Sequence, residues 1–407
     1  MPASSTRAKR PPAREHRYVR DEYKDEARPA KRKKRKDPLW ARLTVILGAL
    51  LMMVGGGGIV AARLAIASAT SKITTTTMID SKSGALAGAN IDGAINLLMV
   101  GIDVEERADR GGGVLSDSIV IMHIPKTHDQ AYLLSIPRDT KVSIEKNPKS
   151  NFGGTSLAKI NSAFGAGYQG PGTELEKRAR GVDLLARTIN KLTGIKFNGA
   201  MLIDFDGFRS IVEELGGVDL CVDQRAESIH LAHDATGKIV DVWYDDAASQ
   251  VRGIPKGGKV VVHEPGCRAF TAQLALDFSR IRKGLENGDY DRQRHQQQLI
   301  KAIAKKATSK GVLTDPGKLN RVIAAGGKAM ILDPGGVPLE DFIFTMKDVA
   351  ANDLVMIRTN PGTWSIENVN GQSFVVLNEA SLQLFHAARD GNLSEFLVTH
   401  PEFLAGS

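Results

Sequence analysis

The sequence lacks the patterns that mark several common enzyme and metal-binding classes. Its 407 residues include only two cysteines, which excludes a four-cysteine zinc cluster. It contains no Gly-x-x-x-x-Gly-Lys-Ser/Thr loop, no His-Glu-x-x-His pair and no Gly-x-Ser-x-Gly elbow. These absences argue against a P-loop nucleotide hydrolase, a zinc protease of the His-Glu-x-x-His type and an α/β-hydrolase.

The positive charge of the chain is concentrated at its N-terminus. The whole sequence has a formal charge of +8, and residues 1–42 hold 15 Lys and Arg against 6 Asp and Glu. The rest of the chain is therefore close to neutral, so its charge gives no reason to expect a nucleic-acid partner. Because large apolar residues are scarce in residues 1–42, we predict a disordered basic tail there.

An uncharged run follows the tail. Between Arg42 and Arg63 lie 20 residues without a charged side chain, and a helix of about 20 apolar residues spans a bilayer. We predict a transmembrane helix over residues 43–63; a cleaved signal peptide is the alternative, but this run is longer than usual signal sequences. The basic residues before the span place the tail in the cytoplasm. The protein is then expected to be a single-pass cell-membrane protein that contacts membrane lipid and exposes its remaining residues outside the cell.

Both cysteines, Cys221 and Cys267, fall in the part expected outside the cell. That compartment permits a disulfide, and an even number of cysteines suits one. Two small buried hydrophobic side chains would explain the same residues. A disulfide between Cys221 and Cys267 is therefore expected, with the buried pair as the alternative.

Short apolar runs alternate with helical patterns after an expected stalk over residues 64–94. The expected strands are 96–102, 119–124, 131–136, 198–203, 218–222 and 354–357. The expected helices are 182–192, 206–215, 290–308, 316–326, 339–350 and two that begin at 379 and 393. Asn370-Gly371 suits the type I′ turn of a hairpin. Strands that are apolar throughout and alternate with helices predict an α/β fold, a three-layer αβα sandwich with a mixed central sheet, over residues 95–400.

Charged residues stand where three of these strands begin or end. Asp103 follows the first strand, Asp117 precedes the second and Arg138 follows the third. If the first two strands are antiparallel, all three side chains share one edge of the sheet, where such folds bind ligands. Carboxylates suit a Mg²⁺ ion held against a substrate phosphate, and arginines offset phosphate charge. Each aspartate alone is equally explained as a turn or cap residue, so the prediction depends on their joint occurrence with Arg138.

A second group of candidates lies in residues 277–300, where five side chains are Lys or Arg. Thr271 is expected to cap a helix that ends at Gly284, and a second helix is expected to begin near Asp289. Guanidinium groups that converge at such a joint suit a multiply charged phosphate ligand. A solvated basic loop would have the same composition. The candidates are Arg280, Arg282 and Arg292.

These motifs together resemble the LytR–CpsA–Psr family. The likeness covers about residues 95–305 and rests on several motifs in the same order. They are residues 96–103, 116–118, 135–140, 159–164, 204–208, 216–218 and the arginine-rich stretch. The resemblance implies an extracytoplasmic α/β domain with Mg²⁺-dependent phosphotransferase activity. Its substrates would be a glycopolymer on an undecaprenyl (polyprenyl) pyrophosphate carrier and, as acceptor, peptidoglycan.

The resemblance also implies roles for individual residues. Asp103 and Asp117 would bind the metal, and Asp289 would order the arginines. The side chains that would bind the pyrophosphate are Arg138, Lys159, Arg280, Arg282, Arg292 and Gln296. Those that would be catalytic are Asp117, Arg138 and Arg280. Two positions depart from the family pattern: Leu115 and His295 stand where arginine is common, so Arg110 and His295 are added as candidates.

Two other functions fit the same residues. One is a non-catalytic receptor or regulator of the cell envelope that binds lipid-linked phosphates and signals through the basic tail. The other is a polyprenyl pyrophosphate phosphatase that uses water as the acceptor. Turnover measured with and without a glycan acceptor separates these alternatives. The motifs do not identify the glycopolymer, a general base or the oligomeric state.

Overall fold

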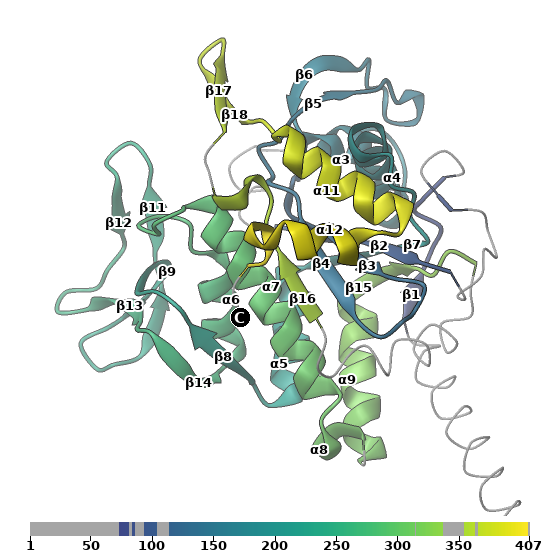
Figure 1. Ribbon diagram of the computed structural model, residues 1–407. Coiled ribbons are helices and arrows are strands. Elements are labelled where there is room, and N and C mark those ends of the chain that lie inside the picture. The colour runs from purple at the N-terminus through teal and green to yellow at the C-terminus, as the bar shows by residue number, and fades with distance from the viewer. Residues whose placement is uncertain are drawn as a thin grey trace, which may run out of the picture. The chain divides into compact units, whose positions relative to one another are not determined.

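Figure 1 shows a computed structural model of the protein. The residues that it describes are 73–80, 84–85, 93–103, 114–313, 315–336, 354–362 and 365–405. The predicted basic tail, the predicted transmembrane helix over 43–63, the predicted helix over 339–350 and Arg110 lie outside these ranges. None of the helices within these ranges combines the length and the apolar character that a membrane span needs.

A seven-stranded mixed sheet forms the centre of the described structure (Figure 1). β2 pairs antiparallel with β3 and parallel with β7, and β3 pairs antiparallel with β4. The prediction of a mixed central sheet is confirmed, and its first two long strands are antiparallel as expected. In order across the sheet, the strands are β1 (Thr74–Thr75), β15 (Met330–Asp333), β7 (Gly199–Asp204), β2 (Ile95–Ile102), β3 (Ser116–Ile124), β4 (Ala131–Ser135) and β16 (Leu354–Ile357).

Helices cover both faces of this sheet. Alternate side chains of a strand point to opposite faces, so they pack in different cores. Leu98 and Val100 of β2 pack in one core with residues of α3, α4 and α11. Ile95 and Leu97 face the other side, where Ala304 of α7 packs against them. α5, α8 and α9 contribute to a neighbouring core near α7. The longer helices are α3 (Asn161–Tyr168), α4 (Glu174–Thr193), α5 (Phe205–Leu215), α6 (Ala272–Arg280), α7 (Asp289–Ala307), α9 (Pro316–Ala329) and α11 (Glu379–Asp390), and the shorter ones α8 (Lys310–Leu313) and α12 (Leu393–Thr399).

β1 lies within the range that was expected to form a stalk. It pairs in parallel with β15. Met78, just after β1, is only 2% exposed and packs in the core that contains α3 and α4. The backbone N–H of Met78 donates to Asp333 Oδ2 at 2.7 Å. β1, which precedes the other strands in the sequence, therefore forms one edge of the central sheet.

Helix boundaries follow the capping residues. α4 begins at Glu174, ahead of the expected start near Val182, because Thr173 and Glu176 form a capping box. The Thr271 hydroxyl accepts a hydrogen bond from the backbone N–H of Leu274 and caps α6, as predicted. The prediction that Gly284 ends this helix is wrong. α6 ends at Arg280, because Ile281 takes an extended conformation and is fully buried.

The region between β8 and α6 folds into short strands that the sequence did not predict, apart from β8 itself (Figure 1, left). We call residues 218–270 the strand-rich segment. Its elements are β8 (Val218–Val222), β9 (Ala226–His233), β10 (Ile239–Asp241), β11 (Trp243–Asp245), β12 (Gln250–Arg252), β13 (Lys259–His263) and β14 (Gly266–Phe270). Two further hairpins are β5 (Lys141–Ile144) with β6 (Thr155–Lys159), and β17 (Ile366–Val369) with β18 (Gln372–Val375). The second turns at Asn370 and Gly371, whose φ angles of 51° and 76° match the expected type I′ turn.

Cys221 and Cys267 face each other across the β8–β14 pair and are joined by a disulfide. Both side chains lie on the exposed face of their strands, while Val218, Leu220 and Val222 of β8 are buried. Since strand side chains alternate between faces, this pattern disfavours the alternative of two buried thiols. The disulfide closes a loop of 46 residues in sequence separation.

Replacing Cys221 and Cys267 together by serine is expected to lower the free energy of unfolding by about 2–4 kcal/mol. The reason is that the open chain regains conformational freedom in the unfolded state. Urea denaturation of the oxidised protein and of the double variant measures the difference. Equal midpoints and slopes would show that this bond does not stabilise the fold.

The buried ring of His123 on β3 should make the free energy of unfolding depend on pH. Its ring is 1% exposed, and its Nδ1 lies 2.7 Å from Asn96 Oδ1 on β2. Burial lowers the pKa of His123 from 6.5 to about 4. Between these values the unfolded chain takes up a proton that the folded chain does not, so acid favours unfolding. We expect His123 to account for a loss of about 3 kcal/mol in the free energy of unfolding from pH 7 to pH 4.

The variant His123→Gln removes the titrating ring and should flatten this part of the stability profile. Thermal or urea unfolding at several pH values between 4 and 7 compares the two proteins. A slope that is the same in both would show that His123 does not carry the effect.

Candidate functional site

The edge of the sheet where β3 begins and β4 ends carries a buried network of opposite charges. Arg138 follows β4, and its Nη1 donates to Asp117 Oδ1 on β3 at 2.7 Å. Asp289, the first residue of α7, lies 2.7 Å from Arg292 Nη2 and 3.7 Å from Arg138 Nε. Arg292 Nη1 also donates to the backbone carbonyl of Asp117 at 2.8 Å. Asp289 therefore lies between two guanidinium groups and holds them in fixed positions.

These contacts oppose the effect of burial on the pKa values of Asp289 and Arg138. Burial alone would raise the pKa of Asp289, but the charges of Arg292 and Arg138 lower it below its usual value. Burial alone would lower the pKa of Arg138, but Asp117 and Asp289 raise it above its usual value. The two carboxylates and the two guanidiniums thus compensate one another.

Arg282 experiences the opposite balance. Burial lowers the pKa of its guanidinium, and the charges of Arg138 and Arg292 lower it further. Asp246 and Asp289 act in the raising direction, but the pKa remains below its usual value. Burial and the neighbouring guanidiniums of Arg138 and Arg292 therefore both disfavour the charged form of Arg282. An anionic ligand would relieve this repulsion, and guanidinium groups are well suited to bind phosphate oxygens.

A cleft of about 490 Å³ opens beside these cations. Its lining includes Arg138, Arg282 and Lys159. Lys159, at the end of β6, lies 3.2 Å from Asp139 through its Nζ. We call this the arginine cleft. It is formed at the ends of β3 and β4, where three of the predicted side chains meet.

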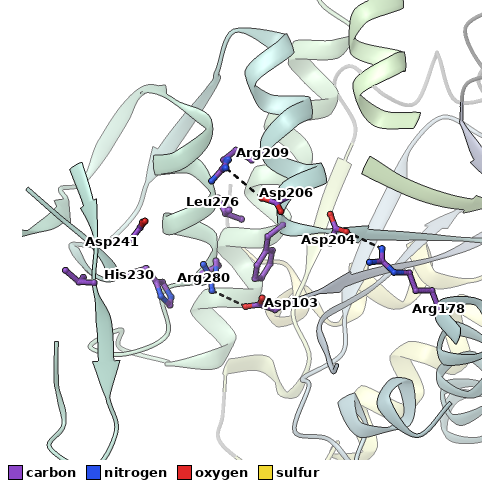
Figure 2. A pocket seen from close by; sticks show the side chains of 11 residues that line it. Asp103, Arg178, Asp204, Asp206, Arg209, His230, Asp241, Leu276 and Arg280 are labelled. Carbon is purple, nitrogen blue, oxygen red and sulfur yellow. Dashed lines mark hydrogen bonds and ion pairs between the residues drawn. The ribbon is translucent and has the colours of Figure 1, made fainter. Parts of the chain in front are cut away.

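Asp103 and Arg280 line a different cleft, of about 540 Å³, at the ends of β2 and β7 (Figure 2). Arg280 Nη2 lies 3.1 Å from Asp103 Oδ2, and its guanidinium lies 4.5 Å from the ring centroid of Phe205. Ile102 pairs with Ser116 across β2 and β3. The two clefts are therefore neighbours along one edge of the sheet, and we call this one the aspartate cleft.

Gln296 and His295 contact other parts of the helices instead of lining either cleft. Gln296 Nε2 donates to the backbone carbonyl of Ser279 on α6 at 3.5 Å. His295 is fully buried, with its ring 4.0 Å from that of Phe278 between centroids. Its Nε2 lies 3.3 Å from Asp223 Oδ1. Both residues therefore join α7 to its neighbours.

Gln297 is a residue that the sequence reasoning missed. Its Nε2 donates to the carbonyls of Leu133 and Ile357 and to Ser135 Oγ, at 2.8 to 2.9 Å. These bonds join α7 to β4 and β16, and so fix the helix that carries Asp289 and Arg292. The run Gln296-Gln297-Gln298 next to an apolar stretch is the sequence signal that could have identified it.

The two predicted metal ligands each bind an arginine. Within the ranges given above, no group of three or more His, Cys, Asp or Glu side chains is arranged to hold a metal ion. Mg²⁺ often takes only one or two protein carboxylates and completes its shell with water and phosphate oxygens. Asp103 and Asp117 stand on adjacent strands at the same edge. Their donor set fits a Mg²⁺ ion that arrives together with a phosphate ligand.

Fold and site define a mixed α/β protein with an arginine-lined cleft at one edge of its central sheet. The sequence model of the LytR_cpsA_psr family matches residues 60–389. The chain belongs to this family, which confirms the resemblance read from its motifs.

Curated relatives carry transferase or cell-wall names. The chain is 25% identical over 257 residues to the polyisoprenyl-teichoic acid–peptidoglycan teichoic acid transferase TagV of Bacillus subtilis, covering 62% of this chain and 54% of TagV. It is 25% identical over 323 residues to the cell wall biosynthesis protein LcpA of Corynebacterium glutamicum, covering 73% of this chain and 56% of LcpA. The chain thus spans about half the length of the curated relatives it matches.

Solved structures share the fold. A Streptococcus agalactiae protein superposes with a TM-score of 0.54 at 18% identity, covering 74% of this chain and 88% of that protein. A structure of TagT bound to LIIa-WTA superposes with a TM-score of 0.52 at 20% identity, covering 78% of this chain and 96% of TagT. At these identities the likeness establishes the α/β fold.

Proposed function

We propose that this protein is a phosphotransferase of the cell envelope. Its substrate would be a glycopolymer on a polyprenyl pyrophosphate carrier, and its acceptor would be peptidoglycan. The name of the TagV relative supports this class of reaction, and the name of LcpA supports a role in cell wall biosynthesis. The structure of TagT bound to LIIa-WTA supports a ligand of that kind for the fold. The observation that carries the proposal is the arginine cleft itself, in which Arg138, Arg282 and Lys159 line one hollow while Asp289 lies between Arg138 and Arg292.

The diphosphate of the carrier would bind in the arginine cleft. Arg138, Arg282 and Lys159 line that cleft, and Asp289 holds Arg138 and Arg292 before any ligand arrives. Donors that are already oriented stabilise the charge of a transition state without a cost of reorganisation. An acceptor hydroxyl would form a new bond to the sugar-linked phosphorus. The bond from that phosphorus to the bridging oxygen would break, polyprenyl phosphate would leave, and the hydroxyl proton would be released.

Asp103 and Asp117 are the residues that would hold Mg²⁺, and the ion would offset part of the diphosphate charge. Arg280 and Arg138 contact these same carboxylates, at 3.1 and 2.7 Å. Each arginine would therefore orient its aspartate toward the cleft edge. Removal of Mg²⁺ by a chelator should reduce transfer, and added Mg²⁺ should restore it.

The proposed location is the outer face of the cell membrane, with the basic N-terminus in the cytoplasm. The uncharged run over 43–63 and the basic residues before it support this orientation. The disulfide between Cys221 and Cys267 supports it independently, because such bonds persist in oxidising compartments outside the cytoplasm.

The test uses the full chain in detergent micelles with a labelled polyprenyl pyrophosphate-linked glycan and Mg²⁺. If the protein is a transferase, labelled polymer should appear on a soluble glycan-strand fragment, together with an equal amount of released polyprenyl phosphate. Release of polyprenyl phosphate at the same rate without the acceptor would identify a phosphatase instead. Tight donor binding with no release under either condition would identify a receptor.

A further inference from the structure

The aspartate cleft has no role in the phosphate chemistry beyond Asp103 and Arg280. Its walls come from several parts of the fold (Figure 2). Asp204 ends β7 and Asp206 and Arg209 lie on α5, while Leu276 lies on α6. His230 and Asp241 reach the cleft from the strand-rich segment. A hollow of about 540 Å³ built by several separate elements is within the range of small-ligand sites.

Charge in this cleft is nearly balanced, which limits the kind of ligand that it takes. Four aspartates and three arginines line it. Each arginine lies beside an aspartate: Arg280 is 3.1 Å from Asp103, Arg178 is 3.2 Å from Asp204 and Arg209 is 3.8 Å from Asp206. A site of this kind offers no net attraction to a polyanion or to a polycation. It offers directional donors and acceptors instead.

Paired carboxylates and guanidiniums of this kind suit a ligand with many hydroxyl groups. A carboxylate accepts two hydrogen bonds from neighbouring hydroxyls, and a guanidinium donates two in a fixed fork. Val242 and Leu276 add apolar surface to the same lining, which suits the C–H face of a pyranose ring. We propose that the aspartate cleft binds the neutral sugar units of a glycan, and that this glycan is the acceptor strand. This inference rests on the function proposed above.

The position of the cleft decides in favour of the acceptor. The arginine cleft lies at the ends of β3 and β4, and the aspartate cleft lies at the ends of β7 and β2. In phosphoryl transfer the attacking and leaving oxygens lie roughly in line on opposite sides of phosphorus. If the arginine cleft holds the diphosphate that leaves, the hydroxyl that attacks must approach from the other side. The aspartate cleft is the neighbouring hollow along this edge of the sheet, because Asp103 follows β2 and Asp117 lies on the adjacent strand β3.

Arg209→Gln is the variant that tests this cleft. Arg209 is 48% exposed, so the variant should fold, and its loss removes a donor to the sugar without touching Asp103 or Arg280. Arg225→Gln is the matched control: Arg225 is 54% exposed, also pairs with an acid, and is not among the residues that line the cleft. We expect Arg209→Gln to weaken binding of a soluble glycan-strand fragment about tenfold, the effect of one or two hydrogen bonds. Asp241→Asn should weaken it in the same direction, and the control should bind as the wild type does.

Calorimetry of the full chain in detergent, without donor, measures this binding independently of any turnover. Loss of affinity in both cleft variants supports the inference even if no transfer is ever observed. Unchanged affinity in both variants overturns it, and transfer by the wild-type enzyme would leave the proposed function standing. Where transfer is measurable, the acceptor KM should rise about tenfold in Arg209→Gln, while the donor KM changes less than about twofold. A rise in the donor KM alone would place the donor glycan in the cleft and overturn the assignment to the acceptor.

Discussion

Arg138→Ala is expected to reduce kcat/KM for transfer at least about a thousandfold. Arg138 contacts Asp117 at 2.7 Å, lies 3.7 Å from Asp289 and lines the arginine cleft. Removing one donor that stabilises developing charge typically costs about 10²–10³ in rate. Here the loss also leaves Asp117 with one fewer positive neighbour at the place where a phosphate would bind, which raises the expected effect. The measurement is the initial rate of polymer transfer from a labelled lipid-linked donor.

Folding must be separated from chemistry in this variant. Removing one member of a buried charge pair destabilises a fold by about 3–5 kcal/mol, so thermal melting should be followed beside the rate. Arg138→Lys keeps the charge but loses the planar fork, and it should recover stability more than activity. A folded Arg138→Ala protein that transfers polymer at the wild-type rate would remove Arg138 from the proposed site.

Asp289→Asn is expected to weaken donor binding about a hundredfold and to lower the free energy of unfolding by about 3–5 kcal/mol. Its carboxylate lies 2.7 Å from Arg292 and 3.7 Å from Arg138. Asparagine has nearly the same shape but carries no charge. Asp117 would then be the one carboxylate left in the network, so the two guanidiniums would repel each other and Arg282 more strongly and would move apart. Donor affinity measured by calorimetry and stability measured in urea report the two effects separately.

The matched control for this change is Asp333→Asn. Asp333 is also buried, and its Oδ2 accepts hydrogen bonds from the backbone of Met78 and Ile79. It pairs with Ala200 near the start of β7, at the opposite edge of the sheet from the two clefts. This variant should lose stability and keep its donor affinity. If both variants lost affinity equally, the effect of Asp289 would reflect general destabilisation of the fold and not the position of the arginines.

Asp289 should also remain ionised across the pH range in which such an enzyme works. Although burial would raise its pKa, Arg292 and Arg138 lower it below the usual value. A carboxylate whose folded pKa is lowered stabilises the fold above its unfolded pKa, and that stability is lost as the pH falls through the folded value. Titration of Asp289 is therefore not expected to change donor affinity at mildly acidic pH.

Local sequence patterns predicted much of the fold because their physical causes are local. Thr271 caps a helix through a bond to the backbone three residues away. Asn370 and Gly371 form a turn because both take positive φ angles. The end of α6 was predicted wrongly, because burial of Ile281 in a core and not the following glycine decides where that helix stops. The strands of the strand-rich segment other than β8 were missed, since most are only three to five residues long and partly exposed.

The sequence by itself determined which charged residues stand at strand ends and at the joint between α6 and α7, and their motifs identified the family. It did not determine which cation meets which acid. Arg292 bonds to the carbonyl of Asp117 from 175 residues away, and Arg280 bonds to Asp103 from 177 residues away. Such pairs form only when strand order and register bring distant segments of the chain together. Burial of apolar side chains on both faces of the sheet fixes that order and register. Only the tertiary structure therefore divided the expected single site into an arginine cleft and an aspartate cleft.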